Sequence, residues 1–165
     1  MAELVVLNGS SNIAKSVVKS ILQRGAYSSV KIADAKPYRQ SVYQWERGLS
    51  GITVNRHLTR SAGHINLALE GAQDVVYFTH DYFTMSSDKN SHLEAAAKLT
   101  KKHGVKNFVA VTPFEHDLVY SEDETSHWQK SQDAIQSALQ HNSNTTLLKA
   151  NLAFGPSTHF IHLLT

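Results

Sequence analysis

Short apolar runs alternate along this chain with segments of helical periodicity, and this alternation constrains the fold more than any other feature. Apolar runs predict strands over 3–9, 30–34, 52–55, 74–79, 107–112 and 146–150. Spacing and composition predict helices over 13–22, 65–69, 92–103 and 126–141. Because a strand followed by a helical crossover pairs in parallel with the next strand, the pattern predicts an open, doubly wound parallel α/β sheet.

The size and composition of the chain agree with one globular domain over residues 1–165. Of the 165 residues, 41% are hydrophobic and 18% are charged, so a core can form without a metal ion or a disulfide. The sequence contains no cysteine, which excludes thiol nucleophiles and thiolate metal ligands. The apolar end of the sequence, 158–165, has no helix cap or breaker after it, so we expect the domain to be truncated at its C-terminus.

Charge is distributed unevenly, although the net value of +2 is too small to indicate nucleic-acid binding. Residues 1–60 contain nine lysines and arginines and three acidic residues, whereas residues 61–165 contain seven and eleven. A basic N-terminal part favours a phosphate-bearing ligand or an acidic partner, and an uneven solvated surface is the alternative. No apolar run reaches the roughly 20 residues that a spanning helix needs, so we expect no transmembrane segment.

The histidines do not form the pattern of a metal site. There are ten of them, but no two stand four residues apart on one helix face beside an acidic residue. His159 and His162 are three residues apart and have no carboxylate nearby. We therefore expect no bound metal.

A phosphate-binding turn is predicted directly after the first strand. Gly9 keeps the first position of a G-x-x-G-x-x-G pattern, while Asn12 and Lys15 replace the second and third glycines. The N–H groups at the start of the next helix favour an anion, and Asn12 tolerates the left-handed backbone of such a turn. We assign Gly9, Ser11, Asn12 and Ile13 to this site. Lys15 either holds the helix away from the strand or reaches the phosphate as a cation.

Three more polar residues follow predicted strands and complete the candidate site. Asp34 ends the second strand at the distance where a carboxylate binds the adenosine ribose and favours NAD(H) over NADP(H); a solvated turn residue is the alternative. His80 follows the fourth strand, and either lines a ligand crevice or belongs to an ordinary polar loop. Thr112 ends the fifth strand, and its hydroxyl bonds either a ligand or the strand end itself.

The end of the sequence carries the most specific motif. Extended short-chain dehydrogenases/reductases have an (I/L)-(I/L)-(R/K)-P-x-x-(I/V)-(F/Y)-G segment, and residues 147–156 read Leu-Leu-Lys-Ala-Asn-Leu-Ala-Phe-Gly-Pro. Gly9, Asp34 and the strand openings at Asp74 and Asn107 precede it in the order seen in that superfamily. The whole chain thus resembles the extended and atypical branches of the superfamily, which implies an NAD(P)-binding Rossmann fold.

Within the superfamily, Phe154-Gly155 followed by His159-Phe160-Ile161 is most similar to the Rossmann-type accessory subunit of mitochondrial respiratory complex I. That resemblance implies a structural role among other subunits of a large protein complex, on the matrix side of the inner mitochondrial membrane. It also implies a weak or vestigial site for NAD(P)(H). The NmrA-like redox sensors are a neighbouring group and the alternative, and they imply a cytoplasmic location.

Catalysis in the superfamily requires a Tyr-x-x-x-Lys pair after the fifth strand, because the tyrosine transfers a proton and the lysine lowers its pKa. The corresponding positions here hold Trp128 and Gln132, and neither side chain supplies that chemistry. The resemblance therefore implies no catalytic residues and no hydride transfer. A working NAD(P)-dependent reductase or epimerase is the remaining alternative.

Overall fold

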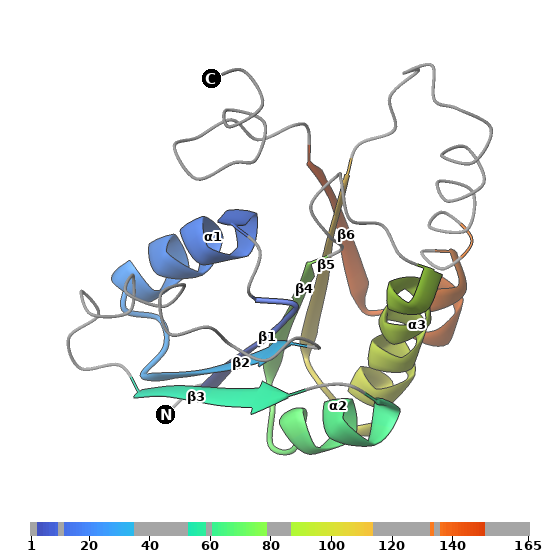
Figure 1. Cartoon of the computed structure of the whole chain (residues 1–165), viewed down its shortest axis with the longest axis horizontal. Helices are drawn as coiled ribbons and strands as arrows, with labels where there is room; N and C mark the ends of the chain where they lie inside the picture. Colours follow the sequence, from blue (N-terminus) through green and yellow to red (C-terminus); the bar gives the residue numbers. More distant parts are fainter. Residues whose placement is uncertain are drawn as a thin grey trace.

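The computed structural model describes residues 3–9, 12–34, 53–58, 61–78, 87–113, 133 and 136–150. The centre of the fold is a six-stranded sheet with the order β3-β2-β1-β4-β5-β6 (Figure 1). Its strands are β1 (Glu3–Leu7), β2 (Ser29–Asp34), β3 (Thr53–Leu58), β4 (Asp74–Phe78), β5 (Asn107–Pro113) and β6 (Thr145–Ala150). All five neighbouring pairs are parallel, as the alternation of strands and helices predicts.

Helices cover both faces of this sheet (Figure 1). α1 (Asn12–Gln23) packs on one face, and α2 (Ala62–Ala68) and α3 (Ser87–Lys102) pack on the other. Residues 136–141 are also helical. The prediction of a doubly wound α/β fold is therefore confirmed. Within the described ranges, no helix is both long enough and apolar enough to cross a membrane.

Alternate residues of the central strands supply the two halves of the core. On β1, Leu4 and Val6 face α1, whereas Val5 and Leu7 belong to the cluster beneath α2 and α3. Because both faces of β1 are buried, its consecutive residues are all apolar, and the strand appears in the sequence as a continuous apolar run.

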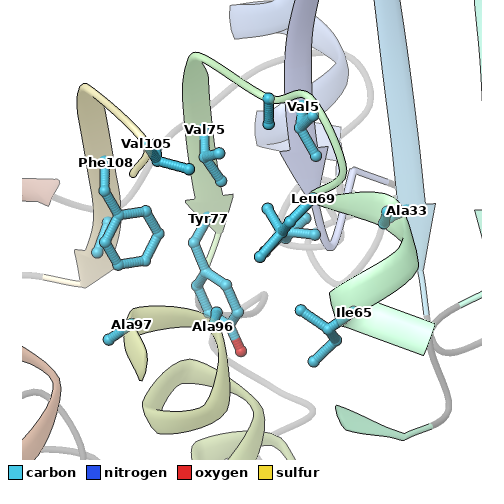
Figure 2. Close-up of a cluster of buried hydrophobic side chains, with 14 of the residues drawn as sticks. Val5, Ala33, Ile65, Leu69, Val75, Tyr77, Ala96, Ala97, Val105 and Phe108 are labelled. Carbon is cyan, nitrogen blue, oxygen red and sulfur yellow. The ribbon is translucent and has the colours of Figure 1, made fainter. Parts of the chain in front are cut away.

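The larger half of the core lies between the sheet and the pair α2 and α3. Figure 2 shows the ring of Tyr77 reaching from β4 toward Ala96 of α3, with Ile65 of α2 beside it. The small side chains of α3, Ala96 and Ala97, let this helix approach the aromatic rings of Tyr77 and Phe108 closely.

Several predicted boundaries are wrong: β1 ends at Leu7 instead of residue 9, and α2 begins at Ala62 instead of residue 65. Two others have a clear cause. α3 begins at Ser87, five residues before the predicted start, because the prediction rested on the Ala- and Lys-rich part of the helix. Ser and Asp are common at helix starts, and the helix here begins with Ser87-Asp88. β3 continues to Leu58 although its sequence turns polar after Val54, because hydrogen bonding to β2 extends the strand through Leu58.

Polar side chains tie the strands together at the amino-terminal edge of the sheet. The Tyr27 hydroxyl donates to Asp74 Oδ2 over 3.1 Å, and Asn107 Nδ2 donates to Asp74 Oδ1 over 2.6 Å. Asp74 thus joins β5 to the segment before β2. Burial, reinforced by the hydrogen bond and the negative charge of Asp74, raises the pKa of Tyr27 above its ordinary value of 10.0.

We predict that this tie is lost in alkali. Because the folded chain holds the Tyr27 proton more tightly than the unfolded chain, the contribution is complete below a pH of about 10 and disappears as the pH rises through the raised pKa. The free energy of unfolding, measured with urea, should therefore fall less in Tyr27→Phe than in the wild type when the pH is raised from neutral to strongly alkaline. An identical alkaline loss in both proteins would contradict the assignment.

Candidate functional site

The carboxyl ends of β1 and β4 mark the point where the strand order reverses. From β1 the chain crosses by α1 to β2 on one side, and after β3 it returns by α2 to β4 on the other side. Leu7 at the end of β1 is in register with both Ala33 and Tyr77. In open α/β sheets the crevice for ligands lies at this reversal, outside the carboxyl ends of the strands.

Asn8 occupies this point and joins three strand ends. Its main-chain N–H donates to the Ala33 carbonyl over 2.8 Å, and its side-chain Nδ2 donates to the Phe78 carbonyl over 2.9 Å. Its φ is 58°, the one left-handed value among the described residues other than glycine. Only 8% of the residue is exposed. A buried residue held in a rarely populated conformation is typical of functional sites.

Gly9 follows in the narrow space beside β2. A Cβ atom at this position would lie 2.6 Å from Ile32 Cγ2 and 3.2 Å from Val6 Cγ1, so the turn has no room for a side chain. Its φ is not in the left-handed region. Gly9 is therefore required for close approach of the main chain, and Asn8 takes the left-handed conformation of the turn.

α1 begins at Asn12, three residues after Gly9. Asn12 is thus helical and does not use the left-handed backbone that an asparagine tolerates; the left-handed residue of the turn is Asn8. The first turn of α1 contains no acidic residue, so the chain itself does not neutralise the positive end of the helix dipole. An anion beside Gly9 would be stabilised by this end.

The contact between α1 and the sheet is made by Ala14, whose exposed fraction is 0%, together with Val18 and Leu22. A small residue thus lies where helix and strand meet, next to Lys15 in the sequence. Lys15 is part of the helical main chain. The replacement of the third glycine is compatible with close packing of α1 against β1 and β2.

The structure brings Gly9, Asp34 and Thr112 to the same edge of the sheet. Asp34 is the last residue of β2, in register with Leu58, and Thr112 is next to last in β5, in register with Lys149. Asn12 and Ile13 form the start of α1. For Asn12, Ile13, Asp34 and Thr112, only the main chain is described. The remaining predicted positions, Ser11, His80, Trp128 and Gln132, lie outside the described residues.

Sequence reasoning missed Asn8. Its signal is the Asn-Gly dipeptide, a strong turn marker in which Asn readily adopts positive φ. The hydrogen bond to Phe78 could not be foreseen, since it depends on the neighbouring position of β4, 70 residues further along the chain. In the described part of the chain, no three His, Asp or Glu side chains gather to hold a metal ion.

Comparison with known proteins places the fold. No protein-family model matches the chain, and no curated protein matches it either. Solved structures do match. A wide-type short-chain dehydrogenase/reductase from Veillonella parvula DSM 2008, in complex with NADP, has a TM-score of 0.69 and 13% identity, over 94% of this chain and 72% of that one.

Two further structures agree. A dTDP-glucose 4,6-dehydratase from Bacillus anthracis str. Ames, in complex with NAD, has a TM-score of 0.70 and 14% identity, over 96% of this chain and 57% of that one. A Rossmann-fold NAD(P)-binding family protein from Shigella flexneri has a TM-score of 0.59 and 15% identity, over 90% of this chain and 66% of that one. The fold is Rossmann-like, and the chain spans about two thirds or less of these last two structures.

We predict that Gly9→Ala strains the turn. The added methyl group would overlap Ile32, whose side chain is buried on β2 and cannot move away freely. Overpacking of this kind lowers the free energy of unfolding by about 1–3 kcal/mol. Chemical denaturation measures the loss, and Gly63→Ala is the control, since its added Cβ would meet nothing closer than 3.7 Å. Equal stability of Gly9→Ala and wild type would contradict the close approach.

Proposed function

We propose that the chain binds a nicotinamide dinucleotide at the carboxyl edge of the sheet between β1 and β4, and that it does so without catalysing hydride transfer. The observation that carries the proposal is the Asn8-Gly9 turn at the strand reversal. Asn8 fixes the turn to β2 and β4, and Gly9 lets it pack closely on the sheet just before α1 begins, which is where a pyrophosphate binds in this kind of fold.

The residues of this edge fit such a ligand. Gly9 packs its main chain directly against Ile32 and Val6 just before α1, and the first turn of α1 carries no acidic residue that would repel a phosphate. Asp34 ends β2, the strand next to β1, where a carboxylate can accept hydrogen bonds from the adenosine ribose. The proposed binding is weak because Asn12, in place of the second glycine, brings a side chain to the position that a pyrophosphate would use. The solved structures with NADP and NAD on this fold support the ligand class.

The absence of hydride transfer rests on Trp128 and Gln132. An indole has no proton acidic enough for transfer to a substrate oxygen, and a neutral amide does not lower the pKa of a neighbouring group as an ammonium does. The bound dinucleotide, which could supply a hydride in an enzyme, would here be a structural or regulatory ligand.

The first prediction from this function concerns Asp34. Removing a carboxylate that accepts hydrogen bonds from the ribose should weaken NADH binding about tenfold or more in Asp34→Ala, since hydrogen bonds to charged groups contribute roughly 1.5–3 kcal/mol. NADPH binding should not weaken, because its 2′-phosphate is repelled by the same carboxylate. Calorimetric titration of both nucleotides measures the change.

Glu94→Ala is the matched control, because it removes a carboxylate from the surface of α3 and leaves the turn intact. In the same samples, NADH absorbance should stay constant when carbonyl substrates are added. Unchanged NADH affinity in Asp34→Ala would contradict the ribose contact. Steady oxidation of NADH by the wild type would contradict the non-catalytic role.

We further propose that the chain is an accessory subunit of mitochondrial respiratory complex I, on the matrix side of the inner membrane, with other subunits as its partners. The resemblance of residues 147–156 and 159–161 supports this assignment. The test is native electrophoresis of the tagged protein from mitochondria of its source. Co-migration with assembled complex I is expected, whereas a soluble cytoplasmic protein that retains dinucleotide would favour the NmrA-like alternative.

A further inference from the structure

We propose that Asn8 is a deamidation site under conformational control: the folded sheet edge protects it, and opening of the edge exposes it. The sequence contains a single Asn-Gly pair, Asn8-Gly9, and the structure places it at the reversal of strand order. This inference does not depend on dinucleotide binding, because protection and its loss follow from the turn alone.

The chemistry needs only the chain and water. The main-chain nitrogen of Gly9 attacks Cγ of Asn8, the bond from Cγ to the side-chain nitrogen breaks, and ammonia leaves as a five-membered succinimide closes. Water then opens the ring at one of its two carbonyl carbons. The product is an aspartate, or an isoaspartate in which the main chain passes through the former side chain. A glycine after the asparagine favours the attack, since no side chain shields its nitrogen.

Three observations indicate protection in the folded state. The side-chain amide is held by the 2.9 Å hydrogen bond from Nδ2 to the Phe78 carbonyl. The main chain on the other side of the residue is held by the 2.8 Å bond to the Ala33 carbonyl. The residue is 8% exposed, so water reaches it poorly. Ring closure joins Cγ to the Gly9 nitrogen and releases Nδ2, the atom that donates to Phe78, and it therefore requires this hydrogen bond to break.

The same contacts make the product damaging. A carboxylate has no hydrogen to donate, so its oxygens would face the Phe78 carbonyl as one acceptor against another. A buried charge without a partner is strongly unfavourable. Isoaspartate would also lengthen the main chain beside Gly9, where the packing on Ile32 leaves no spare space. Deamidation would thus convert a transient opening of the edge into a permanent one.

The experiment compares deamidation of the full chain with that of a synthetic peptide of residues 3–15 at neutral pH. Peptide mapping by mass spectrometry measures aspartate and isoaspartate at position 8 over time. The folded chain is expected to react about 100-fold more slowly than the peptide, because openings of ordered strands are rare. Equal rates, or no reaction at Asn8 in the peptide, would overturn the proposal.

A matched pair of core variants tests whether protection is local. Ile32→Ala removes the side chain that packs on Gly9, whereas Leu69→Ala removes a side chain of similar size from the cluster on the opposite face. The rate at Asn8 should rise more in Ile32→Ala. An equal rise would show that only global unfolding exposes the site, and would overturn protection by the edge.

The consequence of the reaction is tested by substitution. Asn8→Asp imposes the charged product, and Asn8→Gly removes the hydrogen bond while tolerating the left-handed backbone. The urea midpoint of Asn8→Asp should be lower than that of Asn8→Gly. If Asn8→Asp equals wild type in stability, the carboxylate is tolerated beside Phe78 and the damaging effect is refuted.

Discussion

The parallel pairing of β1 on both of its edges is the constraint on which the rest of the structure depends. β1 bonds β2 on one side and β4 on the other, and its residues Leu4 to Leu7 are buried by helices on both faces. A strand enclosed in this way cannot shift its register without moving both halves of the core. The turn that follows it is therefore positioned by the whole fold.

Polar side chains have different partners at the amino-terminal and the carboxyl edge of the sheet. At the amino-terminal edge, charged and polar groups satisfy one another: Lys31 pairs with Glu3 over 2.8 Å and also donates to the Glu70 carbonyl after α2. Such partly exposed pairs contribute about 1 kcal/mol or less each, but they join strands to loops. At the carboxyl edge, the Asn8 side chain joins the end of β1 to the end of β4.

The sequence predicted the architecture well because the strands of a parallel sheet are continuous apolar runs, and these are visible without knowledge of their neighbours. It predicted Gly9 and Asp34 at the correct edge for the same reason, since each follows such a run. It failed where the answer lies in contacts distant in sequence. The length of β3 depends on β2, and the conformation of Asn8 depends on the carbonyls of Ala33 and Phe78.

Asn8 orders a turn that has one glycine in place of the three in the family pattern. A glycine would reach the left-handed region without steric cost, but it has no side chain to tie the turn to β4. Asparagine accepts a small conformational cost and gains the hydrogen bond to the Phe78 carbonyl. The turn is then ordered before any ligand arrives, so less conformational freedom is lost on binding. In the proposed dinucleotide site, pre-organisation of this kind would offset part of the binding lost through replacement of the second glycine by Asn12.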